Sequence, residues 1–129
     1  MGCAYQYTDA QTVISCPLPL VPPDEYRRSL GRIVNRLRLI FPNARLAFAT
    51  TTSVITERMA PGFRRENATI EAYNDIAREV MQREGVAIDD LYPVARDMPE
   101  DWHALDGTHF TEEGYRALAQ AVASFLRGF

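Results

Sequence analysis

The sequence predicts an α/β fold, a small parallel sheet flanked by three helices. Three long segments repeat apolar residues near the helical period of 3.6, and short, mostly apolar segments lie between them. A short apolar strand with a helix on each side is typical of a buried strand in a parallel sheet. The chain has 129 residues, of which 47% are hydrophobic, so it forms one globular domain at most and can bury a core.

Residues 1–23 show little helical character, and we expect an irregular N-terminal segment before a domain that spans 24–129. Residues 12–15 could form a short strand, and the prolines that follow favour an extended path. The segment is either a loop over a functional site or the remnant of a longer N-terminal part. Cys3 and Cys16 are too few for a disulfide scaffold or a cysteine-based zinc site. They form one disulfide in an exported protein, or stay free thiols in a reducing compartment.

The first helix is expected at 24–41. Two prolines lie at its start, where a missing N–H does no harm, and Asp24 and Glu25 favour the positive end of the helix dipole. Its apolar stripe comprises Tyr26, Leu30, Ile33, Val34, Leu37, Ile40 and Phe41. A strand is then predicted at 45–50, and ligands of α/β proteins gather at the carboxyl ends of such strands.

Three hydroxyl side chains follow that strand directly. Thr51, Thr52 and Ser53 are therefore candidate substrate contacts, and the alternative is that they cap turns and satisfy backbone groups. A charged loop over 54–66 comes next, and loops of this length are often lids or binding segments.

The second helix is expected at 68–84, with Asn67 as its N-cap and Gly85 as the left-handed residue after its end. Residues 86–88 then form a short strand. A final amphipathic helix, capped by Thr111, is expected to run to the end of the chain.

The stretch Asp-Gly-Thr-His-Phe-Thr at 106–111 carries the strongest chemical signal. A carboxylate three residues before an imidazole can reach one ring nitrogen, which fixes the tautomer and leaves the other nitrogen free to take a proton from a hydroxyl. Asp106 and His109 are therefore candidates for the orienting acid and the general base. Alternatively, Asp106 only stabilises the turn and His109 only packs beside Phe110. His103 has no acid placed in this way, and we expect a surface or loop histidine.

Residues 105–115, Leu-Asp-Gly-Thr-His-Phe-Thr-Glu-Glu-Gly-Tyr, closely resemble the last sequence block of the SGNH (GDSL-type) hydrolases. The resemblance extends upstream through Ala-Thr-Thr-Thr-Ser-Val at 49–54, Tyr-Asn-Asp-Ile-Ala at 73–77 and Asp-Asp-Leu-Tyr at 89–92. In that family the Asp and His of the last block complete a Ser-His-Asp triad, so the resemblance implies that Asp106 and His109 are catalytic. It also implies a partial three-layer α/β/α sandwich of the SGNH type over roughly residues 24–127.

The family's nucleophile lies in an early Gly-Asp-Ser block, and its oxyanion hole uses that serine's N–H, a glycine and the asparagine of a Gly-x-Asn-Asp block. None of these blocks occurs in the sequence, so the chain is similar to the later part of the family domain. The nucleophile is therefore unknown. Ser53, at the end of a strand, and Ser15 or Cys16, in the proline-rich segment, could reach the site, whereas Ser29 and Ser124 lie within helices.

The resemblance implies a carboxylic-ester hydrolase that acts on small esters or acylated carbohydrates or lipids. The alternative is a non-catalytic, truncated relative with a structural or binding role. The sequence has no Gly-rich phosphate loop and no metal-ligand pattern, so we expect no cofactor and no metal. Because the family's first strand lies inside its sheet, we expect an exposed sheet edge. That edge either leaves the isolated chain marginally stable or pairs with a partner, as in a homo-oligomer.

The formal net charge of -3 gives no electrostatic basis for a nucleic-acid or anionic-membrane partner. No apolar run approaches the length of a membrane span, and no signal peptide is evident. The localisation is therefore unknown, with the cytoplasm as the default expectation.

Overall fold

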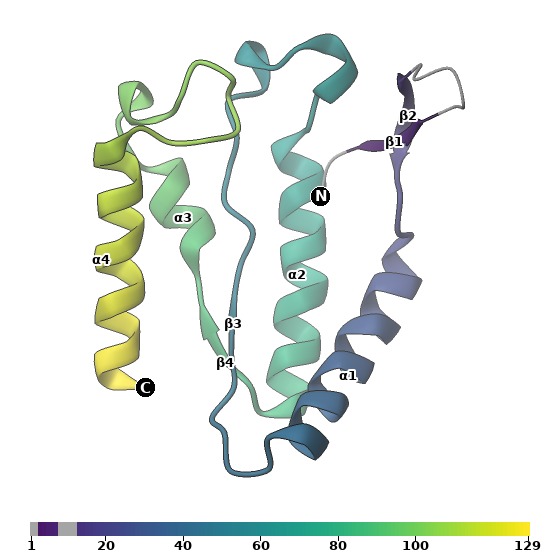
Figure 1. The fold of residues 1–129 in the computed structure, drawn as a ribbon, viewed down its shortest axis with the longest axis vertical. Helices are drawn as coiled ribbons and strands as arrows, with labels where there is room; N and C mark the ends of the chain where they lie inside the picture. Colours follow the sequence, from purple (N-terminus) through teal and green to yellow (C-terminus); the bar gives the residue numbers. More distant parts are fainter. Residues whose placement is uncertain (1–2, 8–12) are drawn as a thin grey trace.

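Within the described residues, 3–7 and 13–129, the chain folds into four α-helices, a small parallel sheet and a separate hairpin (Figure 1). The structure is a computed structural model, and it describes side chains from residue 19 onward. The helices are α1 (Pro23–Ile40), α2 (Asn67–Glu84), α3 (Leu91–Arg96) and α4 (Glu112–Gly128). The strands are β1 (Cys3–Tyr7), β2 (Val13–Pro19), β3 (Ala47–Ala49) and β4 (Ala87–Asp89). This mixed arrangement confirms the predicted α/β class.

The N-terminal segment is more regular than we expected. β1 and β2 pair antiparallel, with Tyr5 opposite Ser15, so the strand expected at 12–15 corresponds to the start of β2, although residue 12 lies outside the described residues. The extended path that prolines impose is also the path of a strand, and tyrosine, valine and isoleucine favour strand pairing. The structure describes the backbone of Cys3 and Cys16 but not their side chains, so their pairing stays a prediction.

The central sheet consists of β3 and β4, which lie side by side and run parallel, with Phe48 paired to Ile88. Among the described residues these two strands pair only with each other, so each has one backbone edge without a neighbouring strand. Ala47 and Ala49, which share one face of β3, are exposed. One face of this strand is therefore open to solvent.

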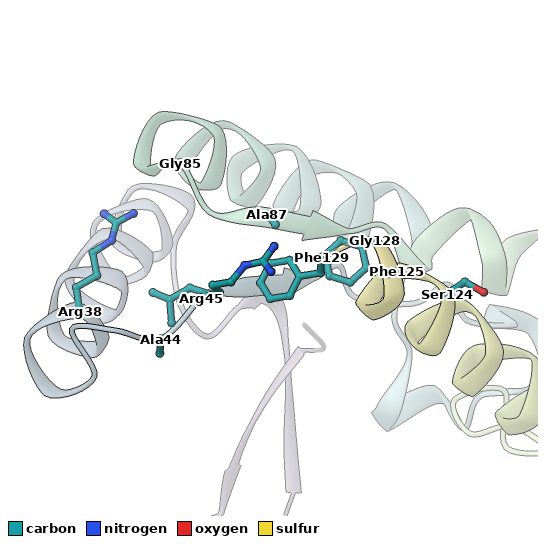
Figure 2. A pocket seen from close by; sticks show the side chains of 10 residues that line it. Arg38, Ala44, Arg45, Gly85, Ala87, Ser124, Phe125, Gly128 and Phe129 are labelled. Atoms are coloured by element: carbon teal, nitrogen blue, oxygen red, sulfur yellow. The ribbon is translucent and has the colours of Figure 1, made fainter.

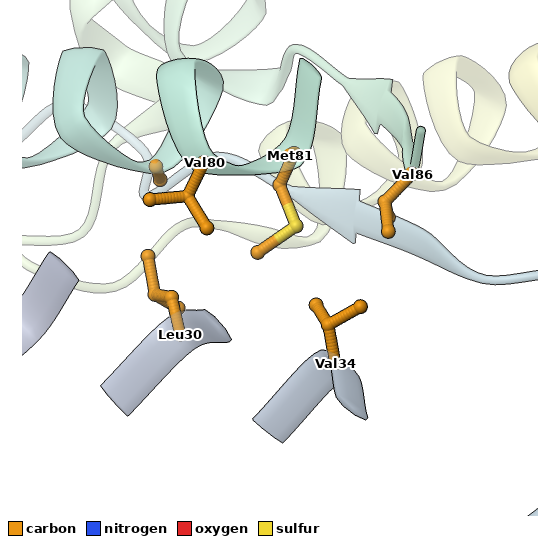
Figure 3. Packing of buried hydrophobic residues seen from close by; sticks show 6 residues of the cluster. Leu30, Val34, Val80, Met81 and Val86 are labelled. Atoms are coloured by element: carbon orange, nitrogen blue, oxygen red, sulfur yellow. The ribbon is translucent and has the colours of Figure 1, made fainter. Parts of the chain in front are cut away.

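The main hydrophobic core lies between α1, α2 and the start of β4 (Figure 3). Leu30 and Val34 of α1 pack against Val80 and Met81 of α2, and Val86 closes the cluster. Leu30 and Val34 belong to the apolar stripe that the helical period predicted for the first helix. The packing fixes α1 and α2 on one side of β3, which positions the segments that follow each strand.

The predicted helices are confirmed, but their apolar stripes are only partly covered. α1 and α2 each begin one residue earlier than expected, and the Thr111 hydroxyl accepts the Gly114 N–H at the start of α4, as predicted. The exposed apolar side chains near α1 and on α4 include Ile33, Leu39, Ile40, Phe41, Tyr115 and Leu126. In the described part of the chain, no helix has the length and hydrophobicity to cross a membrane. The helices thus present more apolar surface than a two-stranded sheet can cover.

Two asparagines of α2 hold the segment that follows β3. Asn74 is fully buried, and its side-chain amide accepts the Thr51 N–H and donates to the Thr51 carbonyl, both at 2.9 Å. Asn67 makes the same pair of bonds with Val54, at 3.0 and 2.9 Å. These amides satisfy backbone groups that would otherwise need a strand partner. The expectation that Asn67 caps α2 was wrong, because Glu66 holds the N-cap position and the Asn67 amide is engaged by Val54.

Candidate active site

The structure brings Asp106 and His109 into direct contact. The Oδ2 atom of Asp106 lies 2.6 Å from the Nδ1 atom of His109. The other carboxylate oxygen, Oδ1, accepts the backbone N–H groups of Thr108 and His109, each at 2.9 Å. Among the described residues, the second ring nitrogen of His109, Nε2, has no hydrogen-bond partner. The carboxylate therefore fixes both the ring and the backbone of the histidine and leaves one nitrogen available.

These hydrogen bonds stabilise the charged form of the carboxylate. The bond to the His109 ring, followed by the backbone N–H groups of His109 and Thr108, holds the pKa of Asp106 well below its usual value. Asp106 thus stays ionised at neutral and mildly acidic pH. An ionised acceptor beside Nδ1 favours the tautomer with the proton on Nδ1 and the lone pair on Nε2, which is the form that a general base needs.

Gly107 gives the loop the bend that brings the carboxylate to the ring. Its φ of +74° lies in the left-handed region that favours glycine. The Gly107 carbonyl accepts the Ile55 N–H at 2.8 Å, and a Cβ on this glycine would lie 2.3 Å from the Ile55 carbonyl oxygen. The loop that carries the Asp106–His109 pair therefore packs directly against the segment that follows β3.

A cavity of about 440 Å³ lies beside His109. Its lining comprises Asp106, Thr108 and His109 together with Arg58, Met59, Ala60, Phe63 and Arg65. The last five belong to the loop at 54–66, whose length predicted a lid or a binding segment. No pattern in the sequence indicated which residues of that loop would face the pair.

Arg58 ties this loop to the segment that precedes the pair. Its guanidinium donates to the backbone carbonyls of Glu100, His103 and Ala104, at 3.1, 3.0 and 3.4 Å, and to the Glu100 carboxylate at 3.0 Å. Hydrogen bonds from a charged donor are stronger than those between neutral groups. Arg58 is therefore engaged in holding the cavity together.

A family model described as the GDSL-like Lipase/Acylhydrolase family matches residues 18–117. The chain belongs to this family. The match spans β3, the loop at 54–66 and the Asp106–His109 pair, so it includes the residues that form the candidate site. A comparison with curated proteins gave no match.

Solved structures of other proteins share the fold of this GDSL-like chain. The lipase/acylhydrolase from Enterococcus faecalis is 20% identical, with a TM-score of 0.68 over 85% of this chain. LAE5, an alpha/beta hydrolase enzyme from the metagenome of Lake Arreo, is 21% identical, with a TM-score of 0.62 over 81% of this chain. The esterase domain of the ORF1 protein from the zebrafish ZfL2-1 retrotransposon is 13% identical, with a TM-score of 0.65 over 85% of this chain.

The GDSL-like chain spans about half the length of its bacterial and metagenomic neighbours. It covers 54% of the Enterococcus faecalis structure, 47% of LAE5 and 65% of the zebrafish esterase domain. The family's fold is thus present in part, which agrees with the partial SGNH sandwich that the resemblance implied.

The hydroxyl residues that follow β3 lie apart from the cavity of this GDSL-like site. Thr51, Thr52 and Ser53 do not line the cavity beside His109. Ser53 is only 3% exposed and lines a different cavity, which it shares with His103. Their assignment as substrate contacts stays a prediction.

The described serines also lie away from the pair. Ser29, Ser53 and Ser124 do not line the cavity beside His109, and the Ser29 and Ser124 hydroxyls bond within their own helices, to Glu25 and Arg127. The side chains of Ser15, Cys3 and Cys16 lie outside the described residues. The position of a nucleophile beside His109 is therefore not filled by a described serine.

His103 lies in a loop, which is one of the two expected placements, but it is buried and not at the surface. It is 4% exposed, its Nε2 lies 3.1 Å from the Ala95 carbonyl oxygen, and its ring centroid lies 4.9 Å from that of Phe110. The Ala95 carbonyl replaces water at Nε2 and Phe110 covers the ring, while Nδ1 is buried without a hydrogen-bond partner among the described residues. His103 thus helps to support the loop from within.

Another cavity lies beside the starts of β3 and β4, and Figure 2 shows side chains that line it. Arg38, Arg45 and Phe129 contribute to its lining, and the Arg45 guanidinium carbon lies 4.2 Å from the centroid of the Phe129 ring. It contains none of the predicted site residues.

Among the described residues, no group of three or more His, Cys, Asp or Glu side chains is arranged to hold a metal ion.

Proposed function

We propose that the chain supplies the acid–base part of a carboxylic-ester hydrolase that transfers an acyl group to a serine. The observation that carries this is the 2.6 Å contact between Asp106 Oδ2 and His109 Nδ1 at the edge of a cavity. Membership of the GDSL-like lipase/acylhydrolase family supports the reaction class. The proposed substrates are small esters or acylated carbohydrates or lipids, and the reaction needs no cofactor.

In the first half-reaction, His109 Nε2 takes the proton of the serine hydroxyl as the serine oxygen attacks the ester carbonyl carbon. The Asp106 carboxylate stabilises the imidazolium that forms. The imidazolium gives its proton to the departing alcohol oxygen, and an acyl-serine remains. In the second half-reaction, Nε2 takes a proton from water as the water attacks the acyl carbon, and returns that proton to the serine oxygen.

The serine has to come from outside the family blocks that this chain carries. We propose as its source another chain, an upstream region or the N-terminal segment that contains Ser15. Thr51, Thr52 and Ser53 remain proposed substrate contacts. Within this chain, the proposal therefore assigns an acid–base role to Asp106 and His109 alone.

The alternative function is that of a non-catalytic relative that keeps part of the fold and binds a partner. It is favoured by the span of about half of the neighbours' length and by the lack of a described serine at the cavity. An assay on a short chromogenic acyl ester separates the two functions when the chain and its His109→Ala variant are run side by side, each together with the chain or segment that carries the serine. Turnover that disappears in the variant supports the hydrolase, and equal background in both supports the alternative.

The unpaired edges of the sheet suggest how a partner would bind. We propose that a further strand, from a second copy or another polypeptide, pairs with an edge of the β3–β4 sheet, because unpaired strand edges accept backbone hydrogen bonds. We expect the isolated chain to be either marginally stable or self-associated in sedimentation velocity and thermal unfolding. A stable, rigid monomer would contradict this proposal.

A further inference from the structure

Arg65 lines the cavity beside His109, and no partner for its charge is found in the part of the chain that the structure describes. Among the described residues its guanidinium makes no hydrogen bond or ion pair, and its Nε atom is buried without an acceptor. The other arginines nearby are engaged. Arg58 donates to three carbonyls and to the Glu100 carboxylate, and Arg64 pairs with Glu66 at 2.8 Å. Arg65 therefore differs from its neighbours in having its charge uncompensated.

Partial burial of an unpaired guanidinium is unfavourable, because the group loses hydration that no acceptor replaces. The Arg65 side chain is half-buried and starts from a fixed backbone, since the Arg65 carbonyl accepts the buried Thr56 hydroxyl at 2.8 Å. A planar fork of N–H donors held in this way is suited to a carboxylate, phosphate or sulfate. An anion in the cavity would pair with the Nη groups of Arg65, which, unlike Nε, are not buried.

The rest of the cavity allows an anion to bind there. Among the described residues, Asp106 is the only acidic side chain in its lining, and its oxygens are occupied by the His109 ring and two backbone N–H groups. The remaining residues of the loop at the cavity, Met59, Ala60 and Phe63, are apolar and suit a short carbon chain. As far as the described residues go, the cavity thus combines an apolar surface with an unpaired arginine and the proposed base.

We propose that Arg65 forms an anion-binding subsite next to the Asp106–His109 pair, so that the site takes esters whose acid or alcohol part carries a carboxylate, phosphate or sulfate. The assignment of the ligand as an ester substrate rests on the proposed function. Binding of the anion to Arg65 does not require turnover. The half-ester of a short dicarboxylic acid is the simplest member of the class, with one ester group and one carboxylate.

The test is a titration of the isotope-labelled chain with monomethyl succinate, followed by the NMR signals of the His109 ring and of the Thr108 and His109 amides. We expect saturable shifts with this half-ester and none with the neutral dimethyl succinate at the same concentrations. Arg65→Gln should weaken binding by about tenfold or more, the effect of losing a charge-assisted hydrogen bond. The matched control Arg64→Gln removes the same charge from the adjacent residue, which does not line the cavity, and should bind as the wild type does.

Wild-type affinity in Arg65→Gln, equal binding of the neutral diester, or no shift in the wild type would each overturn the subsite. Thermal unfolding of each variant verifies its folding, and Arg65→Lys, which keeps the charge, should retain part of the affinity. The two proposals fail separately. Binding that depends on Arg65 without turnover that depends on His109 would remove the hydrolase alone. Turnover that depends on His109, with half-ester binding unaffected by Arg65→Gln, would remove the subsite alone.

Discussion

Gly107→Ala is expected to lower the free energy of unfolding by about 2–5 kcal/mol, the combined cost of a left-handed non-glycine residue and an overpacked contact. The new Cβ would lie 2.3 Å from the Ile55 carbonyl oxygen. Both atoms belong to backbone or are fixed to it, so no side-chain rotation can relieve the contact. The bond from the Ile55 N–H to the Gly107 carbonyl would have to lengthen, and the loop with Asp106 and His109 would move away from the cavity.

Gly85→Ala is the matched control for this substitution. Gly85 has a φ of +64°, close to that of Gly107, but a Cβ there would meet no atom within 4 Å. Its cost is therefore the conformational part alone, about 1–2 kcal/mol. Urea unfolding of both variants measures the difference. If Gly107→Ala costs no more than Gly85→Ala, the close packing of the two loops does not contribute to stability.

The parts of the site that follow from local spacing could be predicted from the sequence. Asp106 and His109 are three residues apart with a glycine between them, so a turn alone brings carboxylate and ring together. The long helices were equally predictable, because periodicity is a local property. Gly85, after α2, has the left-handed conformation that its residue type predicted.

The parts that depend on distant backbone groups could not be predicted. Arg58 fixes the loop at 54–66 by donating to three carbonyls, and any residue can supply a carbonyl, so no side-chain pattern marks the acceptors. His103 is buried because the Ala95 carbonyl happens to lie within reach. Asn67 has the residue type of an N-cap, but a strand end close to α2 offers its amide two backbone partners at once. In each case a contact distant in sequence prevailed over a local preference.

His109→Ala is expected to lower kcat/KM for a short ester by about 10⁴-fold or more, and Asp106→Asn by about 10³–10⁴-fold, with the serine-bearing partner present. In Asp106→Asn, the position of Oδ1 faces the backbone N–H groups of Thr108 and His109, so the amide oxygen has to stay there. The amide NH₂ group would then face Nδ1, which becomes an acceptor. The ring proton would move to Nε2, where it prevents that nitrogen from taking a proton from the serine.

The double variant should be no slower than His109→Ala, because an acid that only orients a base has no effect once the base is absent. The ring tautomer can be read directly from the ¹⁵N shifts of His109, which need no partner and no turnover. Asp101→Asn, an exposed aspartate of the preceding turn, makes the same chemical change outside the cavity and should leave both tautomer and rate unchanged. Because the hydrogen bonds from His109 and Thr108 hold the pKa of Asp106 below its usual value, its carboxylate stays ionised at mildly acidic pH. Any fall in rate at mildly acidic pH must therefore come from another group.

An Asp106→Asn variant whose His109 ring keeps the wild-type tautomer would refute the orienting role of Asp106.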